Sequence, residues 1–282
     1  MRAFFHYLRG NSLLSTGLVI LLAMTLFCLV GYFMVDIHKA APLSATPDQP
    51  PSRDYWLGTD SAGRELLPVL IAGAPTTLRI GLIAGLLGLG IGIILGFSAG
   101  YFGGIVDSII RSAADVGLTV PALGVLVVIA SVISKTLSPN ILALIIASLA
   151  WMWPTRTIRS QVLTMRERAY VEVARLSGLN NFEIIFKELI PNLLPYLAAS
   201  FVGAVGSAVL AAIGLEVVGL GPQSEPTLGM TIFWARYYAA LARGLWWWWA
   251  PPVVMIILLF ISLFMIAAGL DQLANPRARR TA

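Results

Sequence analysis

The amino-acid sequence predicts an all-α polytopic membrane protein with six transmembrane helices. Of its 282 residues, 58% are hydrophobic and only 12% are charged, whereas soluble domains carry about 25% charged residues. The mean hydropathy is +0.83, and the apolar residues are gathered in blocks close to the roughly 20 residues that a helix needs to cross a bilayer. Helices are expected rather than an open sheet because backbone polar groups in hydrocarbon must be satisfied within their own segment.

Six apolar blocks are long enough to span a membrane. The first block is too long for the apolar core of a signal peptide and has no small-residue cleavage site after it, so we expect it to be retained. A short polar turn, residues 135–139, should make a hairpin of the third and fourth blocks. In chain order, the blocks are residues 13–35, 78–97, 116–134, 139–158, 193–215 and 250–270.

The distribution of positive charge predicts the orientation of these helices. Lys and Arg total 19, and most of them lie in the two terminal segments, in the turn that holds Arg111 and around residues 156–187. Positively charged loops stay in the cytoplasm, so both termini and loop 166–191 are predicted to be cytoplasmic. Segments 36–77 and 217–249 then face outside. The net charge of +5 is therefore a topology signal, and we expect no binding of nucleic acid.

The second apolar block begins a ridge of glycines, and the first apolar block contains a cysteine; both features predict packing. Small residues at a spacing of four let helices approach closely in lipid, and contact with another helix of the same chain is favoured over a subunit interface. The single cysteine, Cys28, rules out an intrachain disulfide and is expected to be a small buried apolar residue. The glycines of the ridge are Gly81, Gly85, Gly88, Gly92, Gly96 and Gly100.

A polar island, residues 166–191, interrupts the apolar pattern. Residues 167–176 are good helix formers with alternating charge, and Gly178 is placed to end this helix in a left-handed conformation. A second helical run, residues 182–190, should continue until Pro191 and Pro195 reset the chain for the next span.

The first helix of this island has a small apolar face. We expect Tyr170, Val171 and Ala174 to present that face to a groove on a partner, as in helix-in-groove recognition. Charged side chains surround the face, namely Arg168, Glu172 and Arg175. The alternative is a solvated loop whose charges serve only topology.

The spacing within the island matches a known motif. Glu172, Ala174, Gly178 and Pro191 fall on the fixed positions of the pattern Glu-Ala-Ala–x3–Gly–x9–Ile-x-Leu-Pro. The departures from it are Val173, Glu188 and Ile190. The segment resembles the EAA loop of bacterial ABC-importer permeases, in which an ATPase partner pushes on this coupling helix. The resemblance implies a type I ABC-importer permease fold.

A second motif follows the first apolar block. Residues 57–64 resemble the Leu-Gly-Thr-Asp-x-x-Gly-Arg-Asp signature of permeases of the dipeptide/oligopeptide/nickel transport family, with Glu65 in place of the last Asp. The similarity covers most of residues 54–275 and implies the shorter of two non-identical permeases. The signature positions are Gly58, Thr59, Asp60, Gly63 and Arg64.

The resemblance also implies partners and a division of the chain. The expected partners are a second permease, one or two ABC ATPase subunits, an extracellular solute-binding protein and the lipid bilayer. Residues 1–77 would form an N-terminal region with the first helix and an extracytoplasmic segment. Residues 78–275 would form the core permease domain, and residues 276–282 a basic cytoplasmic tail.

The sequence lacks the residues for ATP hydrolysis or metal catalysis. A phosphate-binding loop needs Gly-Lys-Ser/Thr, and none of the three lysines, Lys39, Lys135 and Lys187, has that context. The two histidines, His6 and His38, are predicted on opposite sides of the membrane, so they cannot form a zinc or nucleophile site. We therefore expect no enzyme activity, no cofactor and no metal in this chain, with ATP and Mg²⁺ bound in partner subunits.

Polar and aromatic residues near the ends of the spans are candidates for a substrate path. Glu216 is predicted near the outward mouth, because ionisable groups close to hydrocarbon normally face a cavity or a partner. Asp115 is expected to pair with a residue such as Arg111. The run that starts with Trp246 and Trp247 is typical of an interfacial aromatic belt, and a stacking platform for sugar rings is the alternative.

These observations favour a permease subunit of an ATP-driven importer for oligopeptide-type solutes, located in the cell (inner) membrane. Importers with a similar scaffold carry oligosaccharides, nickel chelates or opines, and these stay alternatives. An ion-coupled secondary transporter is more distant, because internal repeats and broken helices with polar residues at the membrane midplane are not evident. A passive channel would not need a docking loop.

Overall fold

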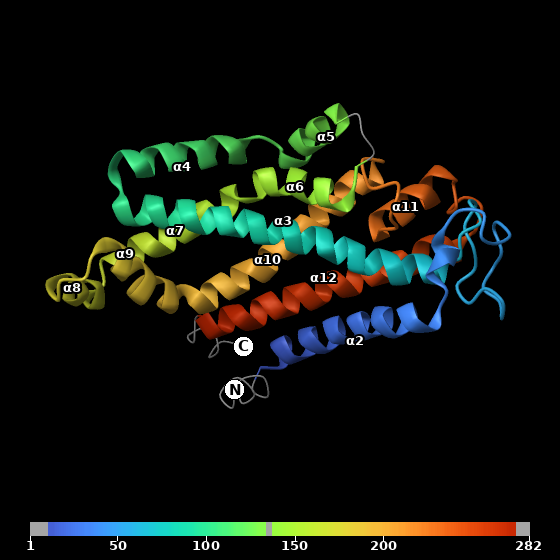
Figure 1. The fold of residues 1–282 in the computed structure, drawn as a ribbon, viewed down its shortest axis with the longest axis horizontal. Coiled ribbons are helices and arrows are strands. Elements are labelled where there is room, and N and C mark those ends of the chain that lie inside the picture. The colour runs from blue at the N-terminus through green and yellow to red at the C-terminus, as the bar shows by residue number, and fades with distance from the viewer. Residues whose placement is uncertain (1–10, 134–136, 275–282) are drawn as a thin grey trace.

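A computed structural model of the protein describes residues 11–133 and 137–274, and this part of the chain is helical without a strand (Figure 1). The all-α prediction is confirmed. In chain order the helices are α2 Ser12–Met34, the 3-10 helix η1 Ile37–Ala40, α3 Leu66–Phe102, α4 Gly104–Thr119, α5 Ala122–Val132, α6 Pro139–Ala150, α7 Met152–Arg166, α8 Ala169–Leu176, α9 Asn181–Glu183, the π-helix η2 Ile184–Leu189, α10 Ile190–Val217, α11 Leu228–Tyr237 and α12 Trp246–Ala274.

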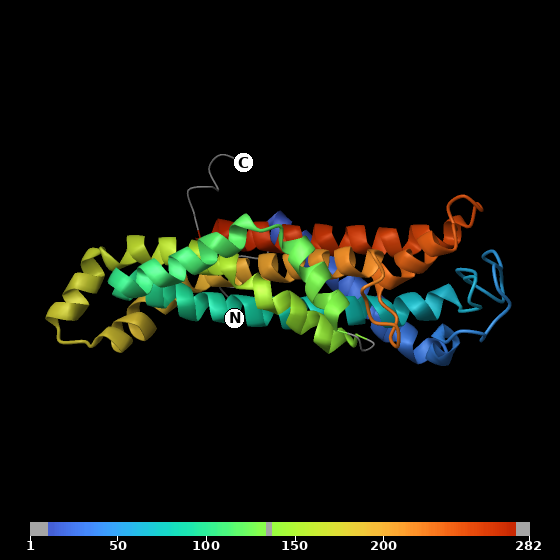
Figure 2. The ribbon, with the colours of Figure 1, turned by 90° about the horizontal axis from the view of Figure 1, so that it is seen from above.

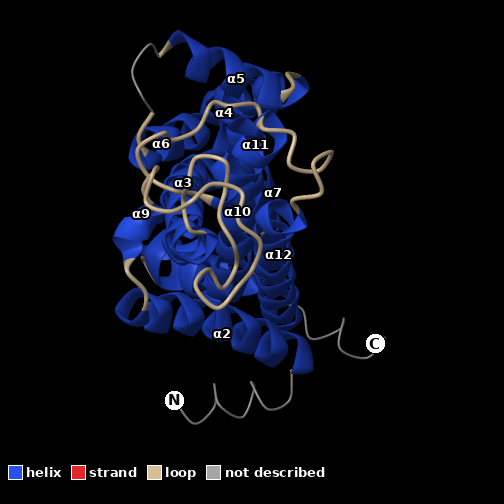
Figure 3. Cartoon of the chain, turned by 90° about the vertical axis from the view of Figure 1, so that its right-hand side faces the viewer, coloured by secondary structure: helices blue, strands red, loops and turns tan. Residues whose placement is uncertain are grey.

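The helices form an elongated bundle whose two ends differ (Figures 1 and 2). Helices α8 and α9 lie at one end, and α11 lies at the other beside the loops that precede α3. Helix α2 begins and α12 ends toward the α8 end. Seen from the loop end, α2 and α5 lie on opposite sides of the bundle (Figure 3).

Within residues 11–133 and 137–274, four helical segments are long and apolar enough to cross a membrane, and the number rises to six if each of two bent pairs counts as one span. The four segments are Ser12–Met34, Leu66–Phe102, Asn181–Val217 and Trp246–Gln272. The bent pairs are α4 with α5, at 85°, and α6 with α7, at 42°. The predicted apolar blocks overlap these segments, but several of the blocks are shorter than the helices. Helix α3 has 37 residues, because it continues past both ends of block 78–97.

The predicted membrane helix over residues 116–134 is not one unbroken helix. The chain breaks at Val120, whose φ of −88° and ψ of 135° are extended. Pro121 follows, and a proline disfavours the helical conformation of the residue before it. Helix α5 therefore turns away from α4 and packs against α6 and α10. The hairpin predicted at 135–139 falls partly outside the described residues, and the basic tail 276–282 falls wholly outside them.

The glycine ridge of α3 packs within the chain, as predicted. At Gly85 a Cβ would lie 2.9 Å from the backbone nitrogen of Val205 on α10, and at Gly88 it would lie 2.6 Å from the Cβ of Ala150. The next glycines face α7. Because these glycines have no side chain, α3 lies directly against the backbones of two helices and occupies the centre of the bundle.

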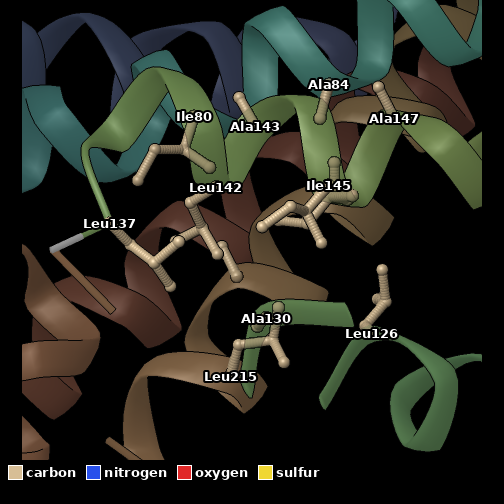
Figure 4. Close-up of a cluster of buried hydrophobic side chains, with 13 residues drawn as sticks. Ile80, Ala84, Leu126, Ala130, Leu137, Leu142, Ala143, Ile145, Ala147 and Leu215 are labelled. Carbon is tan, nitrogen blue, oxygen red and sulfur yellow. The ribbon is translucent and has the colours of Figure 1, made fainter. Parts of the chain in front are cut away.

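A buried apolar cluster joins α3, α5, α6 and α10 (Figure 4). Ile80 and Ala84 of α3 meet Leu142 and Ala143 of α6, and all four are fully buried. Leu215 adds the last turn of α10. The small alanines allow close approach of the helices. Cys28 is also buried, as predicted.

The substitution Gly92→Ala should destabilise the bundle. The new Cβ would lie 2.5 Å from the Cβ of Pro154, and overpacking of this kind costs about 1–3 kcal/mol. Gly90→Ala is the matched control because nothing lies within 4 Å of that position. Thermal unfolding in detergent should give a lower melting temperature for Gly92→Ala alone. Equal melting temperatures for the two variants would contradict the packing described.

Candidate functional site

Helix α8 lies at the tip of one end of the bundle. Arg168 precedes it in an extended conformation, with φ −82° and ψ 146°. After the helix, Gly178 has φ +85°, and the Leu179 N–H donates to the Ala174 carbonyl oxygen at 3.2 Å. The helix predicted over residues 167–176, with its glycine stop, is confirmed within two residues.

The predicted orientation of the small apolar face of α8 is wrong. Val171 is fully buried and Ala174 is 7% exposed, and both pack in a cluster with Ile184 and Leu189 of the same chain. Tyr170 is half-buried at the edge of this cluster. Burial raises the pKa of its hydroxyl. This face anchors α8, because its own chain supplies the nearest apolar partner.

The exposed apolar residues at the α8 end of the bundle lie on the other side of α8 and on the segment that follows it. Val173 is 60% exposed and Leu176 is 83% exposed, on the opposite side of α8 from Val171. Phe182 and Phe186 of the following segment are 67% and 65% exposed. We call these four residues the tip surface. The charged residues Arg168, Glu172 and Arg175 are exposed beside it.

The segment after α8 is part of the next span, which corrects the prediction of a separate helix. Residues Asn181–Val217 form one continuous helical segment. Its π-helical stretch η2 ends where the Ile190 N–H donates to the Ile185 carbonyl oxygen, five residues back. Pro191 follows at the start of α10, where it has no N–H to donate to the preceding π-helical turn, and Pro195 lies inside α10. The two prolines therefore do not divide this segment into two separate helices.

Polar contacts join the α8 turn to the end of α3. The Tyr101 hydroxyl donates to Asn181 Oδ1 at 3.0 Å. The Arg175 guanidinium lies 5.9 Å from the centre of the Tyr101 ring, a cation–π distance. A capping box between Asn180 and Glu183 begins the next helix. The tip is thus fixed to the centre of the bundle.

Ion pairs at the same end connect α4 with α7. Both carboxylate oxygens of Asp107 accept hydrogen bonds from Arg159, whose Nη2 lies 2.6 Å from Oδ2. Asp115 pairs with Arg156 at 3.5 Å, so the predicted partner Arg111 is wrong. The reason is geometric: α7 lies beside α4 and supplies its arginines on the facing side.

The signature of the second motif, residues 57–64, folds together with residues 43–49 at the opposite end of the bundle. We call these two segments the cap. Asp60 is 1% exposed, and it accepts hydrogen bonds from the Ala62 N–H and from the backbone and side chain of Arg64. Thr59 is fully buried, and its hydroxyl donates to the Thr46 carbonyl oxygen at 2.6 Å. Gly58 and Gly63 have φ +74° and +73°, which favours glycine. All these contacts lie within the cap.

The cap is joined to the segment between α11 and α12. Arg243 donates to Asp48 at 2.6 Å and to Ser61 at 2.9 Å. Burial raises the pKa of Asp48, but the hydrogen bonds from Ser61 and Arg243 outweigh it and hold the pKa below its usual value. Trp247 lies against Gly58, and its Nε1 donates to the Thr59 carbonyl oxygen at 3.3 Å.

The residues predicted to line a substrate path occupy different environments. Glu216 is fully buried, where its carboxylate would collide with any side chain at Gly229 of α11. Trp247 is held by the cap, whereas Trp246 is 57% exposed. The structure does not bring these three residues together around one cavity.

A long groove lies instead between α5, α7, α10 and α12. Its volume is about 610 Å³, and α10 contributes small side chains to it, including Ser200, Gly203 and Ser207. Nothing lies within 4 Å of a Cβ built on Gly203. Trp153 and Asp271 line the groove from α7 and α12. The spacing of small residues along α10 was the sequence signal for this groove, and the sequence interpretation missed it.

Residues 92–280 match the family described as binding-protein-dependent transport system inner membrane component. The chain belongs to this family, and it is a multi-pass ABC-importer permease of the dipeptide/oligopeptide family. The fold agrees with this assignment. An inward-facing structure of the MetNI methionine ABC transporter matches with a TM-score of 0.55 at 20% identity, covering 72% of this chain and 94% of that chain.

Several curated relatives are similar over most of the chain. The dipeptide transport system permease protein DppC of Bacillus subtilis is 31% identical over 97% of this chain and 84% of the relative. The oligopeptide transport system permease protein OppC of the same species is 29% identical over 76% and 69%. The glutathione transport system permease protein GsiD of Pectobacterium atrosepticum is 26% identical over 77% and 72%.

The substitution Val171→Ala should loosen α8 from the bundle. It removes apolar atoms from a fully buried site, at a cost of about 2 kcal/mol. Val173→Ala is the matched control because the same atoms are removed from a side chain that is 60% exposed. Hydrogen–deuterium exchange over residues 169–176 should accelerate at least roughly tenfold for Val171→Ala only. Similar exchange in both variants would show that α8 is not anchored by this contact.

Proposed function

We propose that this chain forms, together with a second permease, the path by which peptide-type solutes cross the cell membrane in an ATP-driven importer. The solute class rests on the names of its relatives, which are permeases for dipeptides, oligopeptides and glutathione. The groove along α10 is the part of this path that the chain supplies, with small residues that leave room for a peptide. An extracellular solute-binding protein delivers the solute at the cap end.

The partner ATPases dock on the tip surface and push on α8. The exposed side chains Val173 and Leu176 enter an apolar groove of the ATPase, flanked by Arg168 and Glu172. This arrangement is recognition of a helix by a groove, with the exposed side of α8 instead of the side predicted from the sequence. ATP and Mg²⁺ stay in the ATPase subunits. Both termini are then cytoplasmic, on the side of α8.

The continuous helix Asn181–Val217 is the observation that carries this proposal. Its 37 residues correspond to about 55 Å, long enough to reach from the tip across the membrane. Force on α8 passes through Val171 to Ile184 at the start of this helix. The same helix lines the groove with Ser200 and Ser207. Movement of the tip therefore changes the shape of the path directly.

The substitution Leu176→Asp should uncouple transport without unfolding the protein. The side chain is 83% exposed, so the isolated permease should keep its stability. A carboxylate in the groove of the ATPase would cost about 1–3 kcal/mol, which corresponds to at least a roughly fivefold loss of peptide uptake. The measurement is ATP-dependent uptake by the assembled importer in proteoliposomes, with ATP hydrolysis recorded in parallel.

Leu176→Met is the control for that experiment, because it keeps an apolar side chain of similar volume at the same exposed position. Its uptake should equal that of the unsubstituted importer. Normal coupling in Leu176→Asp would contradict the docking proposed here.

Gly178 should tolerate asparagine but not valine. Nothing lies within 4 Å of a Cβ at this position, so space is not limiting. The φ of +85° is strained for a β-branched residue and acceptable for asparagine. We expect Gly178→Val to displace the end of α8 and reduce uptake severalfold at normal expression, and Gly178→Asn to retain it. Equal uptake in both variants would refute a role of this turn in coupling.

A further inference from the structure

A carboxyl group without a partner is buried where α10 meets α11. Glu216, in the last turn of α10, is fully buried, and neither of its carboxylate oxygens has a hydrogen-bond partner among the described residues. The other buried carboxylates in the described part of the chain, those of Asp60 and Glu65, are each paired with a cation at 2.7 Å. Glu216 is therefore the exception among them.

The start of α11 covers this carboxyl group closely. A Cβ built on Gly229 would overlap Glu216 Oε2, and one built on Gly221 would lie 2.7 Å from Glu216 Cγ. Met230 lies against Gly221 on the same side, with its Sδ 2.6 Å from that Cβ. Because two glycines face Glu216, the backbone packs directly against its side chain and leaves little room for a second molecule.

The polar groups that face Glu216 do not replace a counter-ion. They belong to the first turn of α11. There the Thr227 hydroxyl already accepts the Met230 N–H at 3.1 Å. The Leu228 N–H is already bound to Thr77 of α3 at 3.0 Å. A charged carboxylate with no cation beside it would be costly at such a site, so the neutral acid is the form that fits.

No cation in the described part of the chain reaches this carboxyl group. Arg236 of α11 donates to a carbonyl oxygen of α10 at 3.0 Å, and Arg79 of α3 donates to a side chain of α6 at 2.7 Å. Helix α11 also carries Tyr237, which is 67% exposed. The loop between α10 and α11 contributes Glu225, which is exposed. Helices α5 and α6 have no ionisable side chain, and the one on α12, Asp271, lies at the far end of that helix.

We propose that Glu216 is a proton-binding site that links the contact between α10 and α11 to pH. In the closed contact the carboxyl group carries its proton. When α11 moves away, water reaches the group and takes up the proton, so the charged form accumulates only in the open arrangement. Raising the pH on the cap side therefore favours opening of this contact, and lowering the pH favours its closure.

A proton fits this site better than a metal ion. Metal cations such as Mg²⁺ and Ca²⁺ take several oxygen ligands, and the described residues contain no group of three or more Asp, Glu, His or Cys side chains that could hold one. The backbone of Gly221 and Gly229 also occupies the space that a hydrated ion would need. A proton needs neither the ligands nor the space.

Hydrogen–deuterium exchange of the assembled importer in lipid nanodiscs tests this proposal. The readout is the exchange rate over residues 228–237, divided at each pH by the chemical exchange rate of an unfolded chain. For the unsubstituted importer this corrected rate should rise at least roughly fivefold from pH 6 to pH 7.5, because release of one proton on opening makes opening up to about tenfold easier per unit of pH. Glu216→Gln has the shape of the neutral acid and no proton to lose, so its corrected rate should not depend on pH.

Glu225→Gln is the matched control, because Glu225 is exposed in the adjoining loop; it should keep the pH dependence of the unsubstituted importer. The two histidines of the chain are present in all three proteins, so their titration does not distinguish them. A flat pH profile of the unsubstituted importer overturns the proposal even if Glu216→Gln does not fold. An equal slope in Glu216→Gln, or a dependence on sodium concentration in place of pH, would also overturn it. The measurement needs neither ATP nor peptide, so its failure leaves the proposed transport function unaffected.

Discussion

The structure depends on the contact between α8 and the helix that follows it. Val171 and Ala174 bury one side of α8 against Ile184 and Leu189. An eight-residue helix is too short to be stable alone in water, so this apolar contact is what keeps it helical. Because the same contact covers one side, the other side, with Val173 and Leu176, stays free for a partner.

Close packing of α3 against α10 and α7 makes the rest of the bundle a rigid frame for α8. Gly85 and Gly92 place the backbone of α3 directly against α10 and α7. Arg166, at the end of α7, donates to the Gly100 carbonyl oxygen of α3 at 3.0 Å. The chain therefore approaches and leaves α8 through helices fixed to α3, and α8 itself cannot swing freely. In the proposed mechanism, a push on the tip would therefore be transmitted to the bundle.

Much of this architecture could be predicted from the sequence, for identifiable reasons. Apolar blocks of bilayer length identified α2, α3, α10 and α12, and the position of Gly178 identified the end of α8. The break at Pro121 was present in the sequence, but the surrounding residues are so apolar that length and hydropathy alone join the two halves. The pairing of Asp115 with Arg156 depends on which helix lies beside α4, which local sequence does not specify.

The candidate site was predicted in position but not in orientation. A face with Tyr170, Val171 and Ala174 fits an apolar groove equally well in this chain or in a partner. Only the three-dimensional position of Ile184 decides between them. The same holds for Trp247, whose place against Gly58 depends on a contact between residues far apart in the chain.

The contact between α10 and α11 would limit the proposed movement of α10. Glu216 is buried against Gly229, and the Leu228 N–H donates to Thr77 Oγ1 of α3 at 3.0 Å, so α11 fastens this end of α10 to the frame. In the middle of α10, one face lies against α3 at Val205, whereas the face with Gly203 borders the groove, since a Cβ there would meet nothing within 4 Å. In the proposed mechanism, a push on the tip would move the part of α10 between the tip and this held end. That part contains the small residues that line the groove, so the proposed movement would change the shape of the groove.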